Sequence, residues 1–198
     1  MSRSSAAVST RIGALAAASA VLVAVMSGCA VREEIPTGPN PGPAVPTSNP
    51  SITPTVPAGG TTLDVSCVEL VSAQTVYDFN PNYGLIDGFS PAAGTPQAQA
   101  IRDGGVACEW MNQTSGDTIV LGASSPGVTV LADLKESAAS GTPVAGVGEA
   151  AYFSSKDGIG RVDAFDAENW VVVSSRAFGA AEDAQTFVVS ALKALPQH

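Results

Sequence analysis

The sequence predicts an α+β domain, an antiparallel sheet of about five strands with helices packed on one face and one disulfide. Strand-like runs occur in groups separated by short turns, as in hairpins, instead of alternating one by one with helices. The chain closes with an amphipathic helix, because seven apolar residues recur at helical spacing between Ala181 and Leu195. Grouped strands with separate helices favour helices gathered on one side of an antiparallel sheet.

The predicted domain begins with helix signals. Ser66 followed by Glu69 has the spacing of a capping box, and Ser72 offers an alternative N-cap. A short helix is therefore expected over residues 67–77. The Asn, Pro and Gly residues of the next stretch predict a loop, and Pro96 then suits the first turn of a second short helix.

Five strand-like runs follow, bounded by turn residues. A hairpin turn is expected between the first two runs. Ser125 and Pro126 are expected to begin a helix after the second run, as N-cap and first-turn proline. Glu182 and Asp183 suit the start of the closing helix, and Lys193 suits its end. The five runs are residues 106–113, 117–123, 148–155, 160–167 and 169–175.

Residues 1–28 have the layout of an export signal, with two arginines before an apolar run too short to cross a bilayer. The residues at its end resemble the lipobox of bacterial lipoproteins, with Met26 where Leu is most frequent. In that motif the cysteine, here Cys29, receives a diacylglyceryl group and becomes the first residue. An ordinary secretory signal is the alternative. The matching residues are Val25, Met26, Ser27, Gly28 and Cys29.

Residues 29–62 read as a lipidated cysteine followed by a disordered Pro/Ser/Thr-rich tether. Eight of the twenty-two residues from 36 to 57 are proline, which prevents a backbone ladder and favours an extended, solvated chain. Such a composition also occurs in O-glycosylated stalks, and disorder without sugar is the simpler interpretation. The tether leaves residues 63–198 for one envelope domain.

The charge of the exported chain is strongly acidic. Removal of the signal takes two of the nine Lys and Arg residues and leaves seven against eighteen Asp and Glu. Such a surface repels phosphate backbones, so no nucleic-acid partner is expected. The lipid at Cys29 makes the outer face of the cytoplasmic membrane the expected location, with a cell-wall component or an envelope protein as the expected partner.

Cys67 and Cys108 are left as an even pair once Cys29 is assigned to lipid. An oxidising extracytoplasmic setting favours a disulfide between them. Two buried thiols are the alternative. A metal site is less favoured, because two cysteines without a nearby histidine do not complete a zinc shell.

The arrangement resembles the small actinobacterial cell-envelope lipoproteins of unknown function. The features that carry this resemblance are the cysteine that opens the domain, the Cys108-x-Trp110 strand, the Gly146-to-Ala150 turn and the alanine-rich closing helix. Extracellular sensor domains of actinobacterial kinases share a similar layout. The resemblance implies the pairing of Cys67 with Cys108 and supplies no catalytic residue.

Three patterns with chemical meaning favour structural explanations. His198 is the only histidine and is the last residue, so nucleophile–histidine catalysis has almost no support. Gly146, Gly148 and Ala151 fit a dinucleotide fingerprint, but they precede a strand instead of a helix, so no cofactor is expected. The acidic residues between Asp163 and Glu168 lack EF-hand spacing, and strand alternation separates Asp163 from Asp166, so solvated carboxylates are expected and no metal site.

Four aromatic residues between positions 77 and 89 form the candidate partner-binding loop. They lie among Asn, Asp, Gly and Pro, and exposed loop aromatics are common at binding surfaces. Folding of these side chains over the edge of the core is the favoured alternative. The residues are Tyr77, Phe79, Tyr83 and Phe89.

These observations together predict a membrane-anchored extracytoplasmic lipoprotein with a non-catalytic binding or structural role in the cell envelope. An envelope hydrolase that uses carboxylates and a sensor or ligand-binding domain are the alternatives.

Overall fold

The computed structural model describes residues 59–196. They lie within the second of the two units into which the chain divides, residues 47–198. The predicted signal, Cys29, most of the tether and His198 lie outside the described residues.

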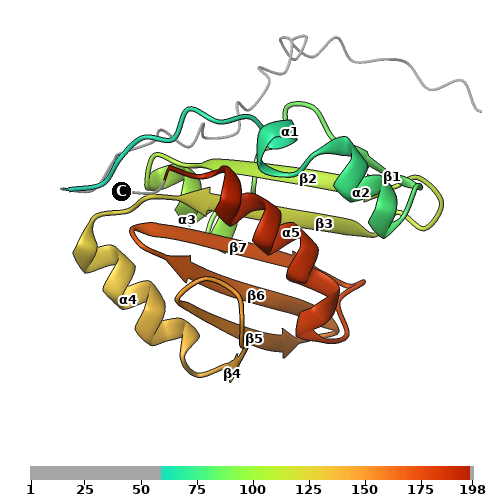
Figure 1. Ribbon diagram of the computed structural model, residues 1–198. Coiled ribbons are helices and arrows are strands. Elements are labelled where there is room, and N and C mark those ends of the chain that lie inside the picture. Colours follow the sequence, from blue (N-terminus) through green and yellow to red (C-terminus); the bar gives the residue numbers. More distant parts are fainter. Residues whose placement is uncertain (1–58, 197–198) are drawn as a thin grey trace, which may run out of the picture. The chain divides into compact units, whose positions relative to one another are not determined.

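The described residues form one seven-stranded sheet in which all neighbouring strands are antiparallel (Figure 1). Its strand order is β1-β2-β3-β7-β6-β5-β4. A β2–β3 hairpin and a β5–β6–β7 meander therefore meet where β3 pairs with β7. The strands are β1 (Tyr83–Leu85), β2 (Val106–Asn112), β3 (Thr118–Ser124), β4 (Thr142–Pro143), β5 (Ala150–Lys156), β6 (Ile159–Asp166) and β7 (Asn169–Ser175).

The α+β class and the antiparallel sheet are confirmed, with two strands more than expected. The five longer strands coincide with the five predicted runs, to within a few residues at their ends. The added strands, β1 and β4, are three and two residues long and form the two edges of the sheet. Strands this short show no alternating pattern in the sequence, and β1 lies in the stretch predicted as a loop.

The helices pack on both faces of the sheet, and not on one face as predicted. One face carries α1 (Cys67–Leu70), α2 (Ala73–Phe79) and α5 (Ala181–Ala194), and the other carries α3 (Pro96–Arg102) and α4 (Val128–Ala138) (Figure 1). The sequence signal lies in β7, where three consecutive valines from Val171 to Val173 are all fully buried. A strand buried on both faces reads as a continuous apolar run, because both of its sides contact other elements.

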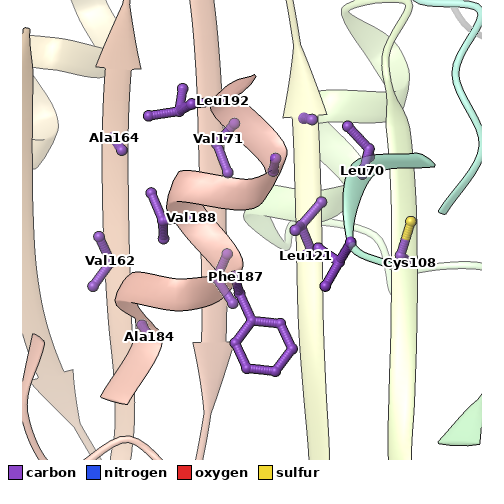
Figure 2. Close-up of a cluster of buried hydrophobic side chains, with 14 of the residues drawn as sticks. Leu70, Cys108, Leu121, Val162, Ala164, Val171, Ala184, Phe187, Val188 and Leu192 are labelled. Atoms are coloured by element: carbon purple, nitrogen blue, oxygen red, sulfur yellow. The ribbon is translucent and has the colours of Figure 1, made fainter. Parts of the chain in front are cut away.

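The larger core lies between the sheet and α5. Phe187 and Val188 project from α5 onto β3, β6 and β7, and Leu70 of α1 closes the side of this core (Figure 2). All three side chains are fully buried. Asp183 caps the start of α5, since its Oδ2 accepts hydrogen bonds from the backbone N–H groups of Gly179 and Ala180 at 2.8 and 2.9 Å.

The smaller core lies on the opposite face. Phe165, Trp170 and Val172 are buried there against Leu131 of α4 and Ala100 of α3. Helix α3 approaches the sheet closely above Gly122, where an added Cβ would lie 3.1 Å from the Cβ of Ala100. A side chain at that position would therefore push α3 away from the sheet.

The single helix predicted over residues 67–77 is two helices, α1 and α2. Of the other predicted helix starts, those of α3 and α5 are confirmed and that of α4 is displaced. Ser72 caps α2 by accepting a hydrogen bond from Thr75, and Pro96 lies in the first turn of α3. Ser66 and Glu69 form the capping box of α1, so both serines that were weighed as alternatives begin a helix. Helix α4 is capped by Gly127, two residues after the predicted Ser125.

Ser125 is instead used for tertiary contacts. Its carbonyl oxygen accepts a hydrogen bond from the N–H of Thr61 at 2.9 Å, and its side chain is hydrogen-bonded to Asn169. Asn169 in turn donates to the carbonyl oxygen of Pro196 at 2.8 Å. The two ends of the described chain are therefore joined to the sheet close to each other.

Candidate functional site

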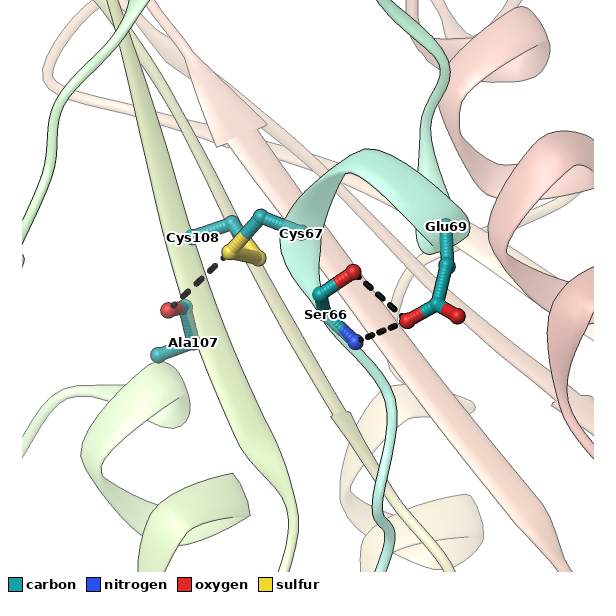
Figure 3. Close-up of a disulfide and its surroundings, with 5 residues drawn as sticks. All are labelled: Ser66, Cys67, Glu69, Ala107 and Cys108. Carbon is teal, nitrogen blue, oxygen red and sulfur yellow. Dashed lines mark hydrogen bonds between the residues drawn. A yellow bond between two sulfur atoms is a disulfide. The ribbon is translucent and has the colours of Figure 1, made fainter.

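The Cys67–Cys108 disulfide joins α1 to β2 and is confirmed. The two sulfur atoms lie 2.07 Å apart and the two Cα atoms 5.7 Å apart, across a sequence separation of 41 (Figure 3). Cys108 is fully buried, and the Sγ of Cys67 lies 3.7 Å from the carbonyl oxygen of Ala107. The bond therefore holds α1 against the first half of β2.

The capping box fixes α1 at its other side. The backbone N–H and the hydroxyl of Ser66 both donate to Glu69 Oε2, at 2.7 and 2.6 Å (Figure 3). The hydroxyl hydrogen bond, followed by the backbone one, lowers the pKa of Glu69 below its ordinary value. Glu69 is thus ionised at neutral pH, and its carboxylate caps the start of α1.

The predicted partner-binding aromatics do not form one loop. Tyr77 and Phe79 lie on α2, and Tyr83 begins β1. Phe79 packs among Tyr83, Phe178 and Phe187, with ring centroids 5.9, 6.2 and 5.2 Å away. Tyr83 is 9% exposed, and burial, helped by the charge of Asp117, raises its pKa. Phe79 and Tyr83 therefore belong to the core, as the alternative interpretation held.

The other two aromatics remain accessible, in different places. Tyr77 is 61% exposed on α2. Phe89 is half-buried and lines a groove of about 430 Å³ beside the disulfide, which we call the disulfide groove. Of the four predicted binding aromatics, Phe89 alone borders this groove, and Tyr77 lies elsewhere on α2.

The disulfide groove has an apolar lining and a polar rim. Val68 of α1 borders it with a 54% exposed side chain. Ser66 and Asp87 lie among its polar residues. The apolar lining consists of Cys67, Val68, Leu85, Ile86, Phe89 and Ala107.

The groove adjoins an open edge of the sheet. The backbone N–H of Ile86 donates inward to the carbonyl oxygen of Glu109 at 2.8 Å, and β1 is the outermost strand. Because successive residues of a strand point their backbone groups in opposite directions, the N–H and C=O of Leu85 point away from the sheet. An extended chain beside β1 could therefore form ladder hydrogen bonds and place its side chains in the groove.

Three residues of this groove are not predicted as site residues from the sequence. Val68, Leu85 and Ile86 carry no motif, and a short apolar run such as Leu85-Ile86 reads as core. Val68 could have been recognised as exposed from the sequence. The capping box places it on a helix of one turn, and Leu70 occupies the buried side of that helix. A second apolar residue in such a helix must lie toward solvent.

The predicted solvated carboxylates are only partly correct. Asp163 is 4% exposed, and its Oδ1 accepts hydrogen bonds from Arg161 at 2.6 Å and from Trp170 Nε1 at 3.1 Å. It is buried because α4 covers its side of the sheet. Alternation does place Asp166 on the opposite face, where it borders a cavity of about 410 Å³, and Glu168 is exposed in the β6–β7 turn.

The Gly146-to-Ala151 pattern forms a turn into β5. Gly146 and Gly148 have φ values of +76° and +56°, and the strand begins at Ala150. An added Cβ at Gly148 would lie 2.4 Å from the carbonyl oxygen of Phe165. Close backbone packing therefore accounts for the glycine at that position.

Within residues 59–196, no three His, Cys, Asp or Glu side chains are placed to hold a metal ion. None of the helices in this range is both long enough and apolar enough to span a bilayer. In comparisons with known proteins, no family model, no curated protein and no solved structure matches the chain.

Proposed function

We propose that the protein is a lipid-anchored extracytoplasmic protein whose domain binds an extended, apolar segment of an envelope protein in the disulfide groove. The observation that carries the binding role is the exposed Val68 beside the open edge of β1. Strand addition at a sheet edge supplies affinity through main-chain hydrogen bonds, while adjoining pockets select side chains. The groove and the edge lie next to each other, as this mode requires.

The location rests on the lipobox together with the disulfide. Disulfides persist in oxidising compartments, and this one joins the two cysteines of the domain that are left once Cys29 is lipidated. The Pro-rich tether would then hold the domain away from the membrane surface. The resemblance to small actinobacterial lipoproteins of unknown function accords with this arrangement.

Two of the carboxylates are engaged in structural hydrogen bonds, which favours a binding role for the domain over a hydrolase. The Asp163 carboxylate accepts hydrogen bonds from Arg161 and Trp170, and the Glu69 carboxylate accepts them from Ser66 at the start of α1. A glycoside hydrolase needs two carboxyl groups facing each other across a cleft. Of the three carboxylates that the acidic cluster contains, Asp163 and Asp166 lie on opposite faces of the sheet and Glu168 is exposed in the β6–β7 turn.

The binding role is tested by site-specific photo-crosslinking in intact cells from position 68. Val128, on α4 and 73% exposed, is the matched control, since it is an equally apolar surface residue on the other face. We expect a defined crosslinked product from position 68 that disappears when Phe89, in the same groove, is changed to Asp and is unaffected by Val128→Asp. Equal crosslinking from both positions would contradict the proposal.

The anchoring is tested separately by mass spectrometry of the protein isolated from its native membrane. The expected mature chain begins at Cys29 and carries acyl groups on that residue. A chain that begins elsewhere, or an unmodified Cys29, would overturn the lipid anchor while leaving the groove proposal intact.

A further inference from the structure

A second, smaller cavity lies on the opposite face of the sheet from α1, the face that carries α3 and α4. It encloses about 210 Å³ where β3 begins and β7 ends. Val120 and Ser174 are cross-strand partners that form its floor, and Ile159 borders it with a 39% exposed side chain. The other residues used below are Arg176 and Asp117.

The floor of the cavity offers a hydrogen-bond donor. The buried Gln97 donates through Nε2 to the hydroxyl oxygen of Ser174 at 3.0 Å and to the carbonyl oxygen of Val120 at 3.3 Å. A serine hydroxyl has one proton to donate as well as lone pairs to accept. Gln97 occupies one acceptor position of Ser174, which lines the cavity, and the Ser174 hydroxyl keeps a proton to donate to a ligand.

The wall of the cavity offers a positive charge. Arg176 is exposed, and its Nη1 makes one long hydrogen bond of 3.4 Å to the carbonyl oxygen of Asp157. Most of its five N–H donors therefore remain for a ligand. A guanidinium beside a hydroxyl donor is suited to a carboxylate, which accepts several hydrogen bonds at once.

A negative charge borders the same cavity. The Oδ2 of Asp117 accepts a hydrogen bond from Ser115 at 2.8 Å, which holds the carboxylate in the β2–β3 turn. Asp117 and Arg176 are not within ion-pairing distance of each other, since the ion pairs among residues 59–196 are Lys135–Glu149 and Arg161–Asp163. Two opposite charges that share a small cavity without pairing leave room for a ligand that carries both.

We propose that this cavity binds a small α-amino acid. The ligand carboxylate would accept from Arg176 and the Ser174 hydroxyl, the ammonium group would face Asp117, and a short side chain would contact Val120 and Ile159. The cavity is smaller than the roughly 300–1,000 Å³ of sites for drug-sized ligands, which favours glycine or alanine over larger amino acids. This site does not depend on the disulfide groove.

The test is calorimetric titration of the full chain with glycine and with alanine, alongside acetate and methylammonium, which each carry one of the two charges. We expect saturable binding of an amino acid and binding at least about tenfold weaker for acetate and for methylammonium, since each loses one charged contact. Absence of saturable amino-acid binding, or equal binding of acetate, would overturn the proposal.

Two variants assign the contacts. Arg176→Gln and Asp117→Asn are each expected to weaken amino-acid binding by about tenfold or more. Lys193→Gln and Glu168→Gln make the same charge changes elsewhere on the surface and are expected to leave binding unchanged. Wild-type affinity in both cavity variants would overturn the site.

A structural readout separates lost contacts from lost folding. Amide NMR spectra of each variant are expected to match the wild type away from the cavity, and alanine is expected to shift the signals of Ser174 and Arg176 in the wild type only. Shifts confined to other regions of the domain would contradict the proposed position.

Discussion

The hydroxyl of Ser190, on α5, donates a hydrogen bond to the carbonyl oxygen of Leu70 at 2.9 Å, across 120 residues of sequence. It connects the last helix of the domain to the first. Helix α1 has only four residues and cannot be stable alone, because one helical turn fixes many dihedral angles for few hydrogen bonds. Its position depends on Ser190, on the disulfide and on the burial of Leu70.

Removal of the disulfide should weaken the domain without abolishing its fold. For Cys67→Ala with Cys108→Ala we expect the free energy of unfolding to fall by about 2 to 4 kcal/mol, because the unfolded chain regains the freedom of the closed loop. Urea denaturation of the double variant, with the wild type in reductant for comparison, measures the difference. Prompt labelling of both wild-type cysteines without reductant would contradict the bond itself.

Phe187 should be among the most costly core positions to truncate. It is fully buried and packs with Phe79, Trp110 and Phe178. Phe187→Ala is expected to lower the unfolding free energy by about 3 to 5 kcal/mol. Tyr77→Ala is the matched control, expected to stay within about 0.5 kcal/mol of the wild type because its ring is exposed. Similar losses for both variants would be inconsistent with the core described.

The two glycines of the Gly146-to-Ala151 pattern should respond differently to alanine. Both have positive φ, which costs a non-glycine residue about 1 to 2 kcal/mol. At Gly146 an added Cβ meets nothing within 4 Å, whereas at Gly148 it lies 2.4 Å from the Phe165 carbonyl oxygen. Thermal melting should therefore show a clearly larger loss for Gly148→Ala than for Gly146→Ala. The reverse order would show that the turn packs differently.

Asp103 should make the stability of the domain depend on pH. It is buried with Oδ2 unpaired, and burial raises its pKa above 3.8, against the opposing effects of the Gln99 hydrogen bond and the Arg102 charge. The folded state therefore holds the proton more tightly than the unfolded chain. The resulting stabilisation is complete below pH 3.8 and is lost as the pH rises through the folded-state pKa.

Asp103→Asn should remove this dependence. We expect its stability relative to the wild type to be greatest above the folded-state pKa and to shrink toward zero as the pH falls to 3.8. Denaturation at a series of pH values checks this, with Asp64→Asn as the control for loss of one exposed negative charge. A constant difference between Asp103→Asn and the wild type at all pH values would rule out the titration of Asp103 as the cause.

The sequence predicts where the helices and strands lie along the chain better than it predicts which face of the sheet each helix covers. Strand-like runs bounded by turn residues locate the five longer strands, and Pro96 locates α3. Ser66 and Ser72, expected as alternative N-caps of one helix, cap two separate helices. The face that each helix covers depends on contacts between distant segments. Gly122 beneath Ala100 is an example, since nothing in the local pattern of either residue indicates that α3 lies above β3.

The candidate sites are less predictable, for physical reasons. Aromatic residues near Asn and Pro made a binding loop a candidate, with folding over the core as the favoured alternative. Phe79 packs against Phe187 and Tyr83 packs against Phe79, so both gain free energy from burial. The disulfide groove arises where β1 stops short of the end of β2. The amino-acid cavity arises where β3 meets β7. Both positions are set by strand register, which is not contained in any short segment.

The strand order also has a consequence for the route by which the domain folds. The β2–β3 hairpin and the β5–β6–β7 meander each form from neighbouring segments, whereas Leu121 of β3 must find Val173 of β7, roughly fifty residues away. We infer that docking of these two preformed halves limits the folding rate. Side chains at the β3–β7 junction should then control how fast the domain folds, while those confined to either half should mainly control how fast it unfolds.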